Sequence, residues 1–261
     1  MKVNEEMVTV SGLGGAMFAK SWIPADCRYE PLILFHDSLG CTDTWKGLPA
    51  ELASLLRRQV ISYDRLGFGR SDRRESLPSS RFVEEEADVY LPSILDYFEV
   101  DQFSVLGHSV GGGMSVHVAA QFPSRCKRLV TVSAQAFVEQ RTRDGILAAK
   151  AFFAGPDAFN RLRKYHGDKT EWVLKAWIDV WLSEAFSNWT LEDVLPKVMC
   201  PTLVIHGGRD EYGSLAFPEM IAERVGGVAT KKVFEACGHM PHKEAPEKFK
   251  GALDSFFGLK L

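Results

Sequence analysis

One serine in the chain stands where a hydroxyl can act as a nucleophile. In "VLGHSVGGG", Ser109 lies between Gly107 and Gly111, directly after an apolar run and directly before a stretch with a helical pattern. The spacing G-x-S-x-G is typical of a sharp strand-to-helix turn that presents a catalytic serine. Because short patterns with two glycines also arise by chance, the rest of the chain must supply the partners that such chemistry needs.

A serine hydroxyl is a poor nucleophile at neutral pH, so it needs a base within hydrogen-bond reach and an acid to orient that base. The stretch "IHGGRD" follows one apolar run and supplies Asp210, and "EACGHMPHKEAP" follows another and supplies His239. The chain order Ser109, Asp210, His239 is the order of triad members in one large fold. The sequence therefore predicts a nucleophile, an acid and a base at three strand ends.

Each of these assignments has an alternative. Ser109 could be a small residue in a structural turn, Glu211 could serve in place of Asp210, and His242 lies only three positions from His239. His108 adjoins the serine, but consecutive residues around a turn point apart. We therefore expect His108 to pack beneath the turn.

Apolar, β-rich runs alternate with longer helical patterns, which is typical of a mainly parallel sheet with helices on both faces. Most runs are continuously apolar, as expected of strands buried on both faces. Two earlier segments, "EMVTVSG" and "GAMFAKSW", joined by "GLGG", predict an antiparallel hairpin at the sheet edge. The strand candidates cover residues 31–36, 59–64, 103–108, 128–133, 201–207 and 231–236, and the helix candidates cover 47–57, 80–98, 110–121, 215–225 and 246–257.

The segment from Gln135 to Lys197 interrupts this alternation. It holds no strand candidate, only amphipathic stretches such as "RTRDGILAAKAFFA" and "DKTEWVLKAWIDVWLSEAF". Long excursions over strand ends are usually functional, so we expect a helical lid. Most of its aromatic residues should be packing residues, with some facing a cleft: Phe152, Phe153, Phe159, Trp172, Trp177, Trp181, Phe186 and Trp189. Of the basic residues, we expect Arg65, Arg141 and Arg143 to be solvated at the surface.

Composition narrows the class of protein. The 261 residues are 46% hydrophobic and carry a formal net charge of -3 without charge blocks, so neither a nucleic-acid nor a membrane partner is expected. "MKVNEEMVTV" lacks the apolar run of a secretory signal, which favours a cytoplasmic location. The five cysteines are odd in number and far apart, which argues against a disulfide framework and a zinc site.

Together these motifs resemble the α/β-hydrolase fold, in its lid-bearing branch of esterases, lactonases and C-C bond hydrolases. The resemblance covers essentially the whole chain and rests on "HDSLG", "YDRLGFGRSD", "GHSVGG", "HGGRDEYG" and "GHMPHKEAPEKF", in the family's order. It implies an α/β fold with a mainly parallel eight-stranded sheet, a core of residues 1–134 and 198–261, and a lid of residues 135–197 inserted after the sixth strand.

The resemblance also implies an oxyanion hole made by two backbone N–H groups. Val110 begins the helix after the nucleophile, where free N–H groups and a partial positive charge suit an oxyanion. Family position suggests Ser38 as the second donor, with Leu39 as the neighbouring alternative, because Asp37 stands where the family usually has glycine.

The implied activity is hydrolysis of a small-molecule carboxylic ester, lactone or related acyl compound with an apolar acyl or aryl part. It would proceed through an acyl-enzyme formed on Ser109, with no cofactor and no metal. Two alternatives remain: cleavage of a carbon–carbon bond in a vinylogous diketone, and a role as a ligand receptor or signalling protein that keeps the triad.

Overall fold

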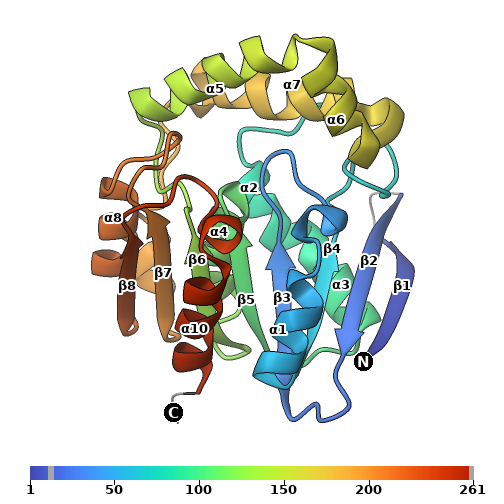
Figure 1. Cartoon of the computed structure of the whole chain (residues 1–261), viewed down its shortest axis with the longest axis vertical. Coiled ribbons are helices and arrows are strands. Elements are labelled where there is room, and N and C mark those ends of the chain that lie inside the picture. The colour runs from blue at the N-terminus through green and yellow to red at the C-terminus, as the bar shows by residue number, and fades with distance from the viewer. Residues whose placement is uncertain (11–14, 259–261) are drawn as a thin grey trace.

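The computed structural model describes residues 1–10 and 15–258, and its centre is one eight-stranded sheet (Figure 1). Every expected strand is present, and all but the first lie within two residues of their predicted bounds; the strand expected from "EMVTVSG" begins four residues earlier, at Lys2. In chain order the strands are β1 (Lys2–Thr9), β2 (Ala16–Ile23), β3 (Tyr29–Phe35), β4 (Arg58–Tyr63), β5 (Phe103–His108), β6 (Cys126–Val132), β7 (Thr202–Gly207) and β8 (Ala229–Phe234).

The spatial order of the strands is β1-β2-β4-β3-β5-β6-β7-β8. The pairs β1–β2 and β2–β4 are antiparallel, and all other neighbouring pairs are parallel. The predicted mainly parallel sheet with an antiparallel hairpin at its edge is therefore confirmed. Of the "GLGG" link in that hairpin, residues 12–14 lie outside the described residues.

Helices cover both faces of the sheet, which explains the continuously apolar strands. Leu32, Leu34 and Leu106 pack with α1 and α10 on one face, whereas Ile33 and Val105 pack with α3, α4 and α8 on the other. The helices are α1 (Leu48–Leu56), α2 (Phe82–Glu85), α3 (Leu91–Tyr97), α4 (Val110–Gln121), α5 (Gln140–Phe153), α6 (Pro156–His166), α7 (Thr170–Trp181), α8 (Ala216–Arg224), α9 (Pro241–Glu244) and α10 (Pro246–Phe257). None of the helices in the described ranges has the length and apolar character needed to span a bilayer.

The expected single helix over 80–98 is divided into three pieces. A wider π-helical turn, η2 (Glu86–Tyr90), separates α2 from α3. Pro92, at the start of α3, has no N–H to donate to the carbonyl four residues earlier, so the regular ladder breaks there. Inside the wider turn, the buried Glu86 carboxylate accepts a hydrogen bond of 2.6 Å from the Tyr63 hydroxyl.

Residues 135–197, here called the cap segment, form a separate layer. Its helices α5, α6 and α7 lie across the carboxyl ends of the parallel strands (Figure 1). Its strand-like pairing is limited to one isolated bridge between Phe137 and Thr190. The cap segment therefore faces the sheet edge at which every predicted site residue emerges.

The register of the sheet brings these strand ends together. Phe35 pairs with Gly107, so the residues that follow β3 lie beside those that follow β5. Gly207 pairs with Phe234, so the turns after β7 and β8 are also neighbours. Residues as far apart in the sequence as His108 and His239 thus meet at one edge of the sheet.

Candidate active site

Ser109 occupies the turn between β5 and α4 in a strained backbone conformation. Its φ and ψ angles are 57° and -127°, which side-chain-bearing residues adopt at a cost of about 1–3 kcal/mol. A Cβ on Gly107 would lie 2.0 Å from the Gly111 carbonyl oxygen, and one on Gly111 would lie 2.3 Å from the Phe35 carbonyl oxygen. The two glycines are therefore required by close backbone approach, and the turn is not a loose loop.

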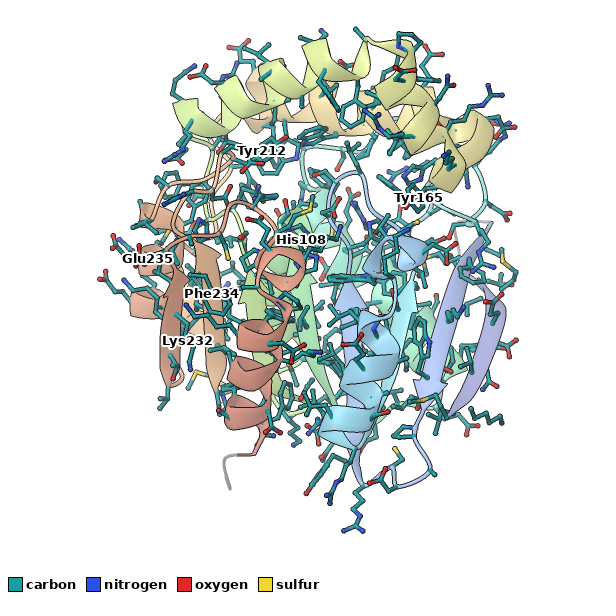
Figure 2. The ribbon with its side chains drawn as sticks, viewed as in Figure 1. His108, Tyr165, Tyr212, Lys232, Phe234 and Glu235 are labelled. Atoms are coloured by element: carbon teal, nitrogen blue, oxygen red, sulfur yellow. The ribbon has the colours of Figure 1, made fainter. Side chains whose placement is uncertain are left out.

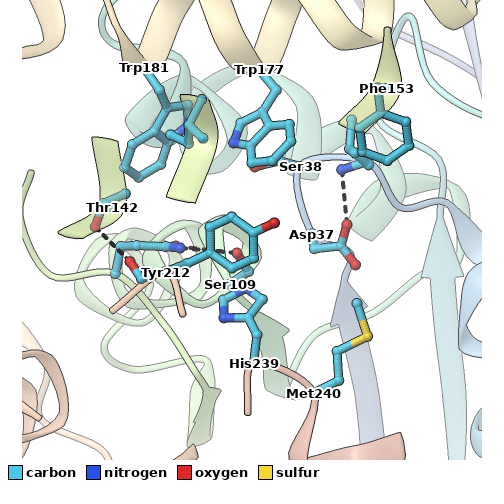
Figure 3. Close-up of a pocket in the computed structure, with 13 residues that line it drawn as sticks. Asp37, Ser38, Ser109, Thr142, Phe153, Trp177, Trp181, Tyr212, His239 and Met240 are labelled. Atoms are coloured by element: carbon cyan, nitrogen blue, oxygen red, sulfur yellow. Dashed lines mark hydrogen bonds between the residues drawn. The ribbon is translucent and has the colours of Figure 1, made fainter. Parts of the chain in front are cut away.

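Asp210 and His239 meet at the ends of β7 and β8. The Nδ1 atom of His239 lies 2.9 Å and 2.8 Å from the two Asp210 carboxylate oxygens, and both side chains are buried. Because a carboxylate only accepts, Nδ1 carries the proton and Nε2 is left as an acceptor. Figure 3 shows the His239 ring directly beneath the Ser109 side chain.

The charge of Asp210 is secured by its surroundings. Burial alone would raise the pKa of Asp210, but the hydrogen bond and charge of His239 outweigh it, so this pKa lies below its ordinary value. The Tyr212 backbone N–H donates a further hydrogen bond of 2.8 Å to the carboxylate. Neighbouring Glu211 is exposed, so Asp210 is the carboxylate that contacts His239.

The Ser109 hydroxyl contacts the side-chain amide of Gln135. The Ser109 Oγ atom lies 3.3 Å from Gln135 Oε1 and 3.2 Å from Nε2. Among the hydrogen bonds of the described residues, none joins Ser109 to His239, and such bonds commonly tighten only when substrate binds. Gln135 is thus a buried polar group in direct contact with the candidate nucleophile.

The loop of residues 37–40 lies beside the start of α4. Asp37 accepts hydrogen bonds from the Leu39 N–H at its carboxylate (2.9 Å) and from the Gly40 N–H at its carbonyl (3.2 Å). Within the described part of the chain, the Ser38 N–H has no hydrogen-bond partner. Val110 is the first residue of α4, so its N–H has no acceptor inside the helix. Of the two sequence alternatives, this geometry favours Ser38 over Leu39 as an oxyanion donor.

Asp37, which is partly exposed to the cavity, pairs with the buried His108 behind this loop. His108 Nε2 lies 2.9 Å from the His239 carbonyl, which only accepts, and Nδ1 lies 3.3 Å from an Asp37 carboxylate oxygen. Nε2 must therefore donate a proton to the carbonyl. The contact between Nδ1 and Asp37 is then favourable only if a second proton lies between Nδ1 and the carboxylate oxygen. Burial would raise the pKa of Asp37, but the hydrogen bond and charge of His108 hold it far below its ordinary value.

A cavity of about 150 Å³ opens above Ser109 and His239 (Figure 3). Of the eight aromatic residues noted in the cap segment, Phe153, Trp177 and Trp181 face this cavity. None of its described lining residues is a lysine or an arginine. The lining consists of Asp37, Ser38, Leu39, Ser109, Gln135, Thr142, Ile146, Phe153, Trp177, Trp181, Tyr212, His239 and Met240.

Comparison with known proteins shows the family to which the chain belongs. The family model of the alpha/beta hydrolase fold matches residues 30–246, which include the turn at Ser109 and the strand ends that carry Asp210 and His239. The chain belongs to the alpha/beta hydrolase fold family.

Its relatives within this family have different names. The 2-hydroxymuconate semialdehyde hydrolase of Pseudomonas sp. (strain CF600) is 27% identical over 247 residues, which cover 87% of this chain and 86% of the relative. The monoglyceride lipase of Homo sapiens is 26% identical over 267 residues, covering 91% and 84%. The crystal structure of the enol-lactonase from Burkholderia xenovorans LB400 matches with a TM-score of 0.74 at 19% identity, over 97% of this chain and 100% of that chain. The names of these relatives therefore do not point to one common substrate.

The three histidines near Ser109 in this hydrolase differ in the groups that they contact. His108 is buried beneath the turn, as predicted. His242 packs with ring centroids 5.4 Å from Trp45 and 4.6 Å from His108, and burial holds its pKa well below the ordinary value. His239, in contrast, reaches the carboxylate and the cavity. The contacts thus favour His239 over His242 as the base.

The expectation that Arg65 is solvated is wrong. Arg65 is buried, its guanidinium donates 2.8 Å to the Asp37 carbonyl, and it lies 4.2 Å from the Phe68 ring centroid. Its backbone N–H donates 3.1 Å to His36 Nε2. Arg65 therefore supports the 37–40 loop from below, whereas Arg141 is exposed and Arg143 is partly exposed.

Sequence reasoning also missed Gln135 and Tyr212. The Tyr212 ring centroid lies 4.8 Å from that of His239, and the Tyr212 carbonyl accepts 2.6 Å from the Thr142 hydroxyl of α5. Burial, with the charges of Glu211 and Asp210, raises the pKa of Tyr212 to about 12. Gln135 and Tyr212 each follow a strand at the carboxyl edge of the sheet. This position in the sequence was the signal that could have marked them as site residues.

Proposed function

We propose that this alpha/beta hydrolase is a serine hydrolase that cleaves a small, uncharged carboxylic ester or lactone through an acyl-enzyme. The observation that carries the proposal is one arrangement of three side chains. Ser109 stands at a strained turn, His239 lies beneath it with its Nδ1 proton held by Asp210, and both open into the same cavity.

The reaction follows from these positions. His239 Nε2 removes the Ser109 proton as Oγ attacks the substrate carbonyl, and Asp210 stabilises the imidazolium that forms. The backbone N–H groups of Val110 and Ser38 receive the negative charge on the carbonyl oxygen. His239 then gives its proton to the leaving alkoxide. Water repeats the sequence on the acyl-enzyme, which releases the carboxylic acid and restores the Ser109 hydroxyl.

The cavity supports a small, neutral substrate. Its volume of about 150 Å³ equals that of an engineered protein cavity that binds benzene, so a single ring or a short acyl chain fits. Trp177, Trp181 and Phe153 provide apolar walls. Because no described lining residue is cationic, a substrate carboxylate would find no counter-ion there, and the Asp37 carboxylate stands close by.

The likeness to 2-hydroxymuconate semialdehyde hydrolase supports a second candidate, hydrolysis of a carbon–carbon bond in a vinylogous diketone. The same three side chains can serve this reaction. A muconate semialdehyde carries a carboxylate, however, and the cavity offers it no cation. We therefore rank the ester or lactone first.

The proposal has two further parts, which concern the cap segment and the cellular setting. We propose that the cap segment acts as a lid that admits substrate to the cavity, since α5 and α7 supply its aromatic wall. We place the activity in a reducing, cytoplasmic setting because the five cysteines are free in the structure.

The test compares the wild-type protein with Ser109→Ala. Both are treated with a fluorophosphonate, and both are assayed with short p-nitrophenyl esters, a small lactone and a vinylogous diketone. We expect stoichiometric labelling and repeated turnover of ester or lactone by the wild type only, with activity lower by about ten-thousand-fold or more in the variant. Undiminished hydrolysis by Ser109→Ala would exclude Ser109, and preference for the diketone would favour the second candidate.

A further inference from the structure

We propose that His166, at the end of cap helix α6, is a positioning residue that holds the 37–40 loop in its oxyanion-binding geometry. His166 is 1% exposed, and no sequence motif singles it out. Its Nδ1 atom lies 2.9 Å from the Gly69 backbone nitrogen, and its Nε2 atom lies 2.9 Å from the Leu39 carbonyl oxygen. This inference rests on the proposed function, since it assigns a purpose to the Ser38 N–H.

The two partners fix the state of the ring. The Gly69 N–H only donates, so Nδ1 must accept, and the Leu39 carbonyl only accepts, so Nε2–H must donate. One neutral tautomer satisfies both contacts at once. Burial lowers the pKa of His166, which agrees with a neutral ring, and the ring also packs edge-on against Phe68 with centroids 6.1 Å apart.

With this contact, both polar backbone groups of Leu39 are hydrogen-bonded to side chains of other residues. The Leu39 N–H is held by the Asp37 carboxylate, and the Leu39 carbonyl is held by His166. Ser38 lies between these two anchors, and its N–H is left to face substrate. The Ser38 N–H belongs to the 37–38 peptide, so a shift of the Leu39 carbonyl would reach this donor through the one peptide that lies between them.

The second contact of His166, with the Gly69 N–H, joins it to a loop that is itself held by hydrogen bonds. The loop that contains Gly69 is tied to Asp64, whose carboxylate accepts 2.7 Å from the Arg70 N–H and 2.6 Å from the Thr42 N–H. Thr42 in turn lies two residues beyond the 37–40 loop. His166 therefore joins the cap segment to two core loops at the point where they flank the site.

Other contacts attach the same part of the cap segment without touching the 37–40 loop. The Lys46 ammonium donates 2.6 Å to the Tyr165 hydroxyl, which lies between α6 and the body of the molecule (Figure 2). Lys169 donates 3.2 Å to the Phe68 carbonyl. These contacts give a matched control, because Tyr165→Phe removes a cap-to-core hydrogen bond next to His166 but leaves Leu39 untouched.

The experiment compares His166→Gln, His166→Asn, His166→Leu and Tyr165→Phe. A glutamine amide reaches the position of Nε2 and can donate to Leu39, whereas an asparagine amide reaches only the position of Nδ1 and can accept from Gly69. We expect kcat to fall by roughly 10- to 100-fold in the leucine and asparagine variants with KM nearly unchanged. The glutamine variant should recover most of kcat, and Tyr165→Phe should match the wild type.

A second measurement needs no substrate. Hydrogen exchange of peptides that span residues 37–40 should be faster in His166→Leu and His166→Asn than in His166→Gln and Tyr165→Phe. If the wild type hydrolyses no ester or lactone, the proposed function fails, while the exchange pattern still decides whether His166 holds the loop. Equal kcat in the glutamine and asparagine variants, or unchanged exchange at 37–40, would overturn the inference, and this pair decides even if His166→Leu fails to fold.

Discussion

The two ends of the same parallel sheet each gather buried polar side chains, but they treat them differently. At the amino ends of β3 to β6, Glu30 accepts 2.7 Å from Arg58 and 2.8 Å from Ser104, and Arg128 lies 3.7 Å away. The Arg58 guanidinium lies 4.4 Å from the Phe257 ring centroid, which covers it. At the carboxyl ends, Ser109 and His239 face a cavity instead.

The charged groups at the amino ends of the strands stabilise the fold, whereas those at the carboxyl ends can take part in a reaction. Burial would raise the pKa of Glu30, but the hydrogen bond and charge of Arg58 keep it below its ordinary value, so the carboxylate is held as a charged partner of Arg58. In the candidate active site the Asp210 carboxylate instead orients the His239 imidazole, whose second nitrogen remains available to a reacting group. A substitution should therefore affect stability at one end of the sheet and turnover at the other.

The largest expected effect is that of Asp210→Asn on turnover. Asparagine keeps the size of the side chain but can donate to His239 Nδ1, which leaves the imidazole in the wrong tautomer. We expect kcat to fall by about ten-thousand-fold, with little change in the unfolding midpoint. Ester hydrolysis and thermal unfolding are measured on the same preparation. Activity within tenfold of the wild type would mean that another group orients His239.

Arg58→Met should produce the opposite result. It leaves the partly buried Glu30 carboxylate with only Ser104 and the more distant Arg128 as partners, which should lower the free energy of unfolding by up to about 3 kcal/mol. The kcat of the folded variant should be unchanged. Neighbouring Arg57→Met is the matched control, because Arg57 is 52% exposed in its contact with Asp26 and should cost less than about 1 kcal/mol. Equal losses in urea unfolding for the two variants would contradict the comparison.

Local sequence rules predicted the parts of the molecule that depend on neighbouring residues. Continuous apolar runs located the parallel strands because both faces of the sheet are covered, and Gly107 and Gly111 located the turn because a Cβ there meets backbone. Pro92 also carried a readable signal for the break in the 80–98 helix.

Contacts between distant residues were beyond such rules. The burial of Arg65 depends on Asp37 and Phe68, and the position of Gln135 beside Ser109 depends on the pairing of β5 with β6. The bridge made by His166 joins residues 97 and 127 positions away. Nothing near these residues in the sequence marks them, since the three-dimensional neighbour, not the local pattern, gives each its environment.

The smallest expected effect per side chain is a loss of stability in mild acid that arises mainly at the active-site end. Burial lowers the pKa of five histidines, of which His36, His166, His206 and His242 lie at or under the carboxyl edge and His117 lies in α4. The unfolded chain binds protons on these side chains below about pH 6.5, while the folded chain does not. Stability is therefore complete above that pH and declines as the pH falls, by up to about 1.4 kcal/mol per pH unit for each histidine.

The Glu30 cluster should not contribute in this range, because its carboxylate takes up protons only at lower pH. Unfolding midpoints between pH 7.5 and pH 5 test this assignment. His242→Phe keeps an aromatic ring against Trp45 and Phe249 but cannot bind a proton, so it should flatten the decline. An identical slope in His242→Phe and the wild type would show that the acid sensitivity lies elsewhere in the molecule.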